Sequence, residues 1–148
     1  MRTDPMPQCE FDVGNIDVRF SMRIKADVNA VAPVVSGVMQ IIKEMKCGVG
    51  KEPEIELALQ EALANAVVHG CGKDLSKSVE FCVACDQSHG LLIVVRDPGP
   101  GFDPASLPNP TVGRNIYSEH GRGIFLVNQL MDEVRFERGG TEIRMRKY

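Results

Sequence analysis

The sequence predicts an α+β fold, a two-layer α/β sandwich in which helices cover one face of a mixed sheet. Strand-like and helix-like periodicities follow one another in the order strand, helix, helix, strand, strand, long loop, helix, strand, strand, which is not a regular alternation. The chain has 148 residues, 43% of them hydrophobic and 25% charged, which suits one domain with a single core.

The first elements follow from local patterns. Residues 1–16 show little periodicity and are expected to be a loose leader to a single domain at 17–148. Apolar and polar residues alternate over 18–24, which predicts a half-buried strand. Apolar residues at helical spacing over 31–45 predict a helix capped by Asp27 or Asn29, with Pro33 in or near its first turn.

A second helix is expected from about 53 to 70, where glycine stops it. An alternating strand over 79–85 precedes the continuous apolar run 91–95, which is typical of a central strand buried on both faces. The stretch 97–122 is rich in proline and glycine and is either functional or disordered. A helix near 124–131 and a closing hairpin around Gly139-Gly140 complete the chain.

Composition excludes several classes of protein. A formal net charge of -3 and a pI near 5.6 argue against a nucleic-acid-binding surface. No apolar run is long enough to span a bilayer, and the amino terminus lacks the apolar segment of a secretory signal. We therefore expect a cytoplasmic protein with no direct contact to membrane or nucleic acid.

The cysteines do not form an even disulfide framework, so reduced thiols are the simplest expectation. The pair Cys82 and Cys85 matches C-x-x-C, but positions three apart on a strand point to opposite faces. A structural role is therefore favoured over a redox pair or a zinc site. The five residues are Cys9, Cys47, Cys71, Cys82 and Cys85.

The second predicted helix carries Glu61, Asn65 and His69, each four residues apart. Such residues drift by only ~40° per step around an α-helix, so they form a polar ridge beside the buried stripe. A polar ridge at this place should face a cleft. The alternative is a solvated pair followed by a histidine that the helix dipole favours.

Two glycine-rich stretches strengthen the case for a site. Asp97-Pro98-Gly99-Pro100-Gly101-Phe102 follows the central strand, where the aspartate can accept from an amino group and the glycines admit a flat ring. His120-Gly121-Arg122-Gly123-Ile124 opens a predicted helix, where free amides favour phosphate. A tight turn and a flexible helix entry are the respective alternatives. P-loop, Rossmann, protein-kinase and hydrolase signatures do not occur in the sequence.

In this order, E-A-L-A-N-A-V-V-H, D-P-G-P-G-F and H-G-R-G-I resemble the N, G1 and G2 boxes of the GHKL ATPase superfamily, the histidine-kinase-like ATPases with the Bergerat fold. The similarity spans about 18–147 and is greatest to the anti-sigma-factor serine/threonine kinases of bacterial partner-switching systems. It implies ATP and Mg²⁺ as cofactors, with Glu61 as catalytic base or positioner and Asn65 as metal ligand. His69 would contact phosphate.

The resemblance also assigns the remaining site residues. Asp97 would bind the adenine amino group, Gly99 and Gly101 would shape the pocket, and Thr141 would lie near adenine. Residues 103–120 would form an ATP lid. The phosphates would be cradled by Gly121, Arg122 and Gly123.

The implied function is phosphorylation of a STAS-type anti-anti-sigma antagonist, coupled to sequestration of a sigma factor by a homodimer. One alternative is an ATP-binding module that sequesters a partner with little catalysis. Another is an interaction domain without nucleotide, whose partner surface or solvated strand face would be the alternating basic residues Arg135, Arg138, Arg144, Arg146 and Lys147.

Overall fold

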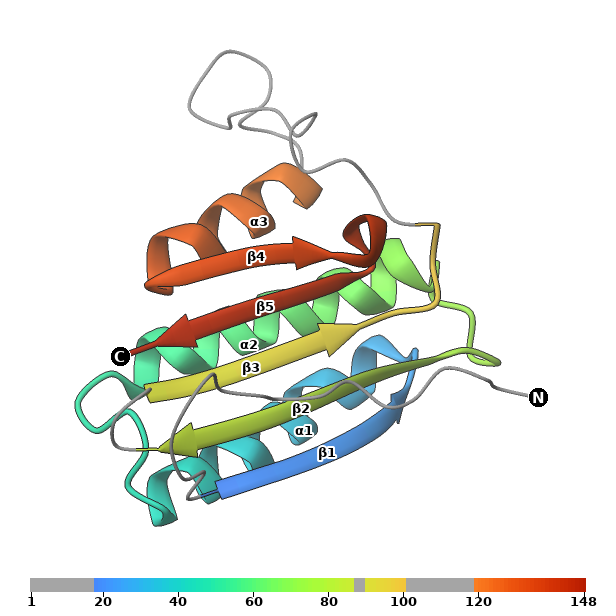
Figure 1. Cartoon of the computed structure of the whole chain (residues 1–148). Helices are drawn as coiled ribbons and strands as arrows, with labels where there is room; N and C mark the ends of the chain where they lie inside the picture. Colours follow the sequence, from blue (N-terminus) through green and yellow to red (C-terminus); the bar gives the residue numbers. More distant parts are fainter. Residues whose placement is uncertain (1–17, 87–89, 101–118) are drawn as a thin grey trace.

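A computed structural model describes residues 18–86, 90–100 and 119–148, in which three helices form a layer against one face of a five-stranded sheet (Figure 1). The predicted two-layer α+β class is confirmed. The elements in chain order are β1 (Val18–Lys25), α1 (Val28–Glu44), α2 (Glu52–Asn65), β2 (Ser78–Asp86), β3 (Gly90–Arg96), α3 (Glu119–Leu130), β4 (Glu133–Glu137) and β5 (Glu142–Lys147).

The strand order is β1-β2-β3-β5-β4, and every neighbouring pair in this described sheet is antiparallel. The expectation of a mixed sheet was wrong. Helices α1 and α2 lie between β1 and β2, and β2 begins at the end of the sheet where β1 stops. The two strands are therefore antiparallel. Strand β4 does run in the direction of β3, but β5 lies between them and separates the two parallel strands (Figure 1).

Helix α1 begins with the predicted aspartate cap. The Asp27 carboxylate accepts from the backbone N–H of Asn29 at 2.9 Å and satisfies one of the free amides of the first turn. Pro33 lies inside the helix, in the second turn rather than the first. The side of α1 that faces the core is buried and consists of Val31, Val35, Val38, Met39 and Ile42.

Helix α2 begins at Glu52, with Pro53 in its first turn and two glutamates near its positive end. It was expected to run unbroken to Gly70, but the regular helix ends at Asn65. A π-helical turn, Ala66–Gly70, follows, and the N–H of Cys71 donates to the carbonyl of Ala66 at 2.9 Å. The wider turn changes the angular relation between Asn65 and His69, and such turns often occur at functional sites.

Strand β3 occupies the centre of the sheet and is buried on both faces, as its continuous apolar run predicts. Leu91, Ile93 and Val95 belong to the main core between sheet and helices. Leu92 and Val94 belong to a smaller cluster on the other face of the sheet, which also holds Cys82 and Ala84.

The cysteines differ from the expectation of reduced thiols. Cys47, in the connection between α1 and α2, forms a disulfide with Cys85 at the end of β2, with their Cα atoms 6.3 Å apart. Sequence spacing could not indicate this pair because 38 positions separate its members. The prediction that Cys82 and Cys85 face opposite sides of the sheet is confirmed, since they belong to different clusters. Cys71 is a buried free thiol.

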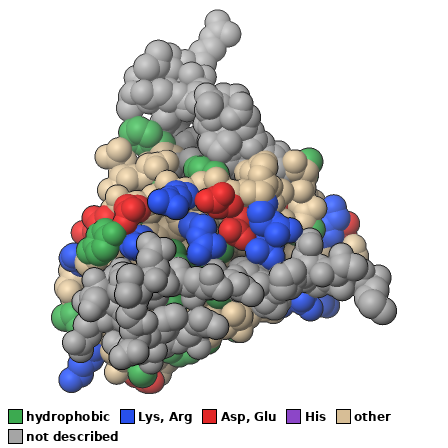
Figure 2. All heavy atoms as spheres, in the orientation of Figure 1, with side chains coloured by type: hydrophobic (Ala, Val, Ile, Leu, Met, Phe, Trp, Pro, Cys, Tyr) green, Lys and Arg blue, Asp and Glu red, His purple; other side chains and the backbone are tan. Residues whose placement is uncertain are grey.

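The outer face of the sheet carries charged side chains in close pairs (Figure 2). Glu142 bonds with Arg96 at 2.7 Å and with Arg144 at 3.2 Å. Arg144 and Arg146 thus belong to a strand face of paired charges. This agrees with the expectation of a strand face rather than with that of a partner surface. Lys147 does not share it, because it is buried and pairs with Glu54 at 2.5 Å. Arg138 lies in the turn between β4 and β5.

Within the described ranges, no helix combines the length and apolarity that crossing a membrane requires.

Candidate functional site

The ends of four secondary-structure elements meet at one end of the molecule (Figure 1). The end of β3, the start of β5, the carboxyl end of α2 with its π-helical turn, and the amino end of α3 all lie there. Helix α2 packs between α1 and α3. These elements carry the residues of all three sequence motifs, so the fold assembles at one place what is scattered over the chain.

Asp97 leaves the end of β3 and is held by its backbone and by its side chain. Its N–H donates to the carbonyl oxygen of Thr141 at 2.9 Å, and its carboxylate Oδ1 accepts from the N–H of Gly99 at 2.7 Å. The Thr141 hydroxyl donates to the carbonyl of Arg138 at 2.8 Å. The three predicted adenine-site residues Asp97, Gly99 and Thr141 therefore lie in one corner.

Gly70 completes this corner, and sequence reasoning missed it. A Cβ atom at Gly70 would lie 2.2 Å from Cγ of Asp97, so the carboxylate packs directly against the bare backbone of the π-helical turn. The sequence marked Gly70 only as a helix stop. The whole of β2 and β3 lies between Gly70 and Asp97 in the chain, and no local pattern reveals a contact between residues so far apart in sequence.

Burial raises the pKa of the Asp97 carboxyl above its ordinary value, and the hydrogen bond from Gly99 opposes this rise. Burial also raises the pKa of the neighbouring Cys71 thiol, and the charge of Asp97 adds to the effect. The Asp97 carboxyl is half-buried, and in partly desolvated surroundings a hydrogen bond from a ligand to the carboxylate is strengthened.

Glu61 and Asn65 lie one turn apart on α2 and are both half-buried. His69 is exposed in the π-helical turn, one residue before Gly70. Gly70 is the last residue of the π-helical turn that directly follows Asn65, so the polar ridge ends next to the Asp97 corner. The helix that carries Glu61 and Asn65 is therefore joined to the Asp97 corner through the turn that ends at Gly70.

The donor set fits Mg²⁺ held mainly by water and phosphate. The described residues contain no cluster of three or more His, Cys, Asp or Glu side chains that could enclose a metal ion. An amide oxygen such as that of Asn65 is a hard ligand, and Mg²⁺ usually takes only one or two protein ligands when it binds with phosphates. The half-buried Asn65 meets that requirement.

The third motif lies in α3, which begins at Glu119, two residues before Gly121. Gly121, Arg122 and Gly123 therefore belong to the first turns of the helix, rather than preceding it. Gly101 and residues 103–118 of the expected lid lie outside the described residues.

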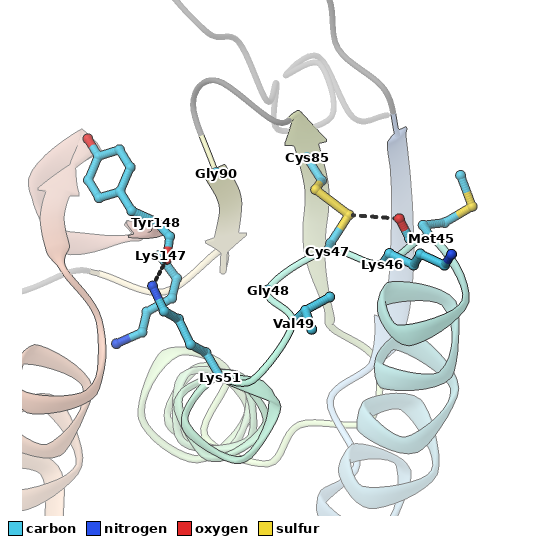
Figure 3. Close-up of a pocket in the computed structure, with 10 residues that line it drawn as sticks. All are labelled: Met45, Lys46, Cys47, Gly48, Val49, Lys51, Cys85, Gly90, Lys147 and Tyr148. Carbon is cyan, nitrogen blue, oxygen red and sulfur yellow. Dashed lines mark hydrogen bonds between the residues drawn. A yellow bond between two sulfur atoms is a disulfide. The ribbon is translucent and has the colours of Figure 1, made fainter.

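A pocket of about 460 Å³ lies at the opposite end of the sheet, beside the first residue of β3 (Figure 3). It is lined by the disulfide of Cys47 and Cys85, by Gly90 and by Lys51 and Lys147. Gly90 and Asp97 are at opposite ends of the same strand, so this pocket is separate from the Asp97 corner.

Comparison with known proteins identifies a domain family and several similar chains. The sequence profile of the histidine kinase-like ATPase domain matches residues 24–147. The chain is 34% identical over 106 residues to the serine-protein kinase RsbW of Bacillus subtilis (strain 168), and 36% identical over 107 residues to RsbW of Bacillus licheniformis. It is 28% identical over 101 residues to an anti-sigma F factor of Priestia megaterium.

These alignments cover 64% of the chain. They span 63% of the length of the two RsbW proteins and 68% of the anti-sigma F factor.

Proposed function

The chain belongs to the histidine kinase-like ATPase domain family, and from this premise we propose that it is an ATP-dependent serine/threonine protein kinase of a partner-switching system. Its substrate is a small STAS-type anti-anti-sigma antagonist. It also sequesters a sigma factor and acts as a homodimer. The names of similar proteins, a serine-protein kinase and an anti-sigma factor, support this combination.

The observation that carries the proposal is the junction between α2 and the Asp97 corner. The helix that holds Glu61 and Asn65 ends in a turn whose last residue, Gly70, packs against the Asp97 carboxylate. A nucleotide whose base lies at Asp97 therefore directs its phosphates along the side of α2 that bears Asn65 and Glu61.

Each residue has a distinct task in this arrangement. Asp97 accepts from the adenine amino group, and Thr141 borders the same corner. Asn65 supplies the protein ligand to Mg²⁺, which when bound neutralises phosphate charge during transfer. Glu61 orients the hydroxyl of the substrate serine or threonine toward the terminal phosphorus and accepts its proton.

The position of Glu61 favours an enzyme over a nucleotide-binding module without catalysis. A module that only binds nucleotide has no use for a carboxylate one turn from the metal ligand, where it adds negative charge next to the phosphates. In a kinase the same carboxylate positions the nucleophile.

A phosphotransfer assay tests the proposal. Purified protein is incubated with Mg-ATP and a candidate antagonist encoded beside its gene, and the antagonist is weighed by intact-protein mass spectrometry. We expect the mass of one phosphoryl group to be added, and no addition when EDTA replaces Mg²⁺. A preparation that binds ATP but transfers nothing would reject the kinase and favour the sequestering module.

A further inference from the structure

Gly70 is in contact with Asp97 in a way that no larger residue allows. An alanine methyl at this position would lie 2.2 Å from Cγ of Asp97 and 2.5 Å from each carboxylate oxygen. These distances are far shorter than van der Waals contact, so the carboxylate keeps its place only because residue 70 has no side chain.

We propose that Gly70 is a positioning residue, which sets the depth and direction of the Asp97 carboxylate and thereby the preference of the site for a purine with a 6-amino group. The inference rests on the proposed ATP site and extends it by identifying the residue that places the recognising group.

The Asp97 carboxylate is bounded on two sides. Gly99 donates its N–H to Oδ1 at 2.7 Å, and a methyl at Gly99 would lie 2.9 Å from the same oxygen. Gly70 borders the whole carboxylate. Oδ2 takes no hydrogen bond from the part of the chain described, so it is the oxygen available to an amino group of a ligand.

Backbone conformation does not explain either glycine. Gly70 and Gly99 do not have the positive φ found at Gly48, Gly72 and Gly139, so alanine can adopt the backbone conformation of both. What requires glycine is the space that Asp97 occupies. A substitution at Gly70 therefore tests the contact rather than the strain of the chain.

The two glycines differ in what a methyl would displace. At Gly99 the obstructing atom is the carbonyl oxygen of Gly70 at 2.2 Å, so the backbone itself would have to move. At Gly70 the obstructing atoms belong to the end of the Asp97 side chain, which can rotate away. Alanine also favours a helical turn over glycine by about 1 kcal/mol, so Gly70→Ala should fold.

The same turn joins both halves of the site. It begins directly after Asn65 and ends at Gly70, so four residues separate the proposed metal ligand from the residue that positions Asp97. Asn65 itself lies in the regular helix before the turn, so a change at Gly70 should alter base selection and leave the proposed Mg²⁺ ligand in place.

The test compares two nucleotides that differ only in the 6-amino group, ATP and purine riboside 5′-triphosphate, both with Mg²⁺. Affinities are measured by calorimetry for the parent, Gly70→Ala, Asp97→Ala and the double variant. Gly37→Ala is the matched control, because Gly37 lies in α1 with nothing within 4 Å of an added Cβ. Thermal unfolding of each variant reports whether it is folded.

We expect the parent to prefer ATP by about tenfold or more, the value of one hydrogen bond to a charged group. Gly70→Ala should lose that preference, while its affinity for purine riboside triphosphate stays within about twofold. In the Asp97→Ala background the glycine substitution should change neither affinity, because two residues that act through one contact are not additive. Gly37→Ala should behave as the parent.

Several results would overturn the inference. A Gly70→Ala protein with an unchanged preference, or additive losses in the double variant, would reject it and leave the proposed function intact. A parent that binds neither nucleotide would reject both. If Gly70→Ala alone unfolds, Asp97→Ala removes the clash and should restore folding, and a double variant that remains unfolded would also reject the inference.

Discussion

The backbone N–H of Asp97 donates to the carbonyl oxygen of Thr141 at 2.9 Å. This bond continues the pairing of Arg96 with Glu142 by one step beyond the end of β3. Two residues that the sequence places in unrelated motifs are therefore neighbours, and the Asp97 backbone is attached to the sheet. The backbone that carries the Asp97 carboxylate is therefore held in position by the sheet.

Asp97→Asn should separate ligand binding from stability. With Oδ1 held by Gly99, the new amide NH₂ takes the place of Oδ2 and opposes the amino group of adenine. We expect ATP affinity to fall about 10- to 100-fold, measured by calorimetry. Undiminished ATP affinity would exclude Asp97 from base recognition.

The stability of Asp97→Asn depends on pH in a defined direction. The folded-state pKa of Asp97 is raised, so its charge destabilises the fold above the unfolded-state pKa and costs nothing below it. The variant should therefore unfold at a higher temperature than the parent at pH 7, and the difference should vanish near about pH 3. Asp74→Asn is a control in which the pH dependence of stability should have the opposite sign, because hydrogen bonds from Ser76 lower the pKa of Asp74.

Glu61→Gln should retain ATP and lose phosphotransfer. The amide keeps the size of the side chain but cannot accept a proton, and general-base catalysis contributes about 10²- to 10⁴-fold. We expect affinity for Mg-ATP within about threefold of the parent and a transfer rate lower by that factor. Equal rates in the mass-shift assay would remove Glu61 from the mechanism. Gln60→Glu, on the exposed side of the same helix, is a control for added charge.

Asn65→Ala should remove the dependence of ATP binding on Mg²⁺. A ligand at 100 times its dissociation constant stabilises a fold by about 2.7 kcal/mol, so binding can be followed by thermal shift. The parent should be stabilised more by ATP with Mg²⁺ than by ATP with EDTA. In the variant the two shifts should become equal, and a variant that keeps the parental difference would contradict a ligand role for Asn65.

The disulfide between Cys47 and Cys85 should contribute to stability. Its members are 38 positions apart, and the chain-entropy relation for such a loop gives about 4 kcal/mol. Cys47→Ser with Cys85→Ser should lower the unfolding temperature by roughly 10 °C. The variant should also respond less to dithiothreitol than the parent does, although some response remains because Cys82 is disulfide-bonded as well. Cys71→Ser is the control. Because Cys71 is a free thiol, its replacement should leave the response of the unfolding temperature to reductant unchanged. Identical melting of the parent with and without reductant would show that the bond is not formed.

The charge pairs on the outer sheet face should stabilise the fold. Glu142→Ala would leave Arg96 and Arg144 without their shared carboxylate, and breaking such a buried pair typically costs about 3 kcal/mol. Denaturant unfolding should show this loss with an unchanged slope. Glu133→Ala, at the more exposed pair with Arg146, should cost about 1 kcal/mol or less. Similar costs for both variants would argue against a special role of Glu142.

Periodicity alone determined much of this protein. Strand alternation over 18–24 and 79–85, the apolar run of β3 and the helical spacing of α1 each depend on which residues are buried, and burial leaves a repeat in the sequence. The same holds for the polar ridge of Glu61 and Asn65, because residues four apart on a helix are neighbours whatever packs around them.

Tertiary structure decided the contacts between distant segments. The insertion of β5 beside β3 made the sheet antiparallel, and the fold brought Cys47 to Cys85 and Gly70 to Asp97. None of these leaves a local repeat, because each depends on where two separate elements end in space. The motif around Asp97 is local in sequence, so it sufficed to assign a ligand to this corner. Gly70, which contacts the Asp97 carboxylate, could be identified only from the folded chain.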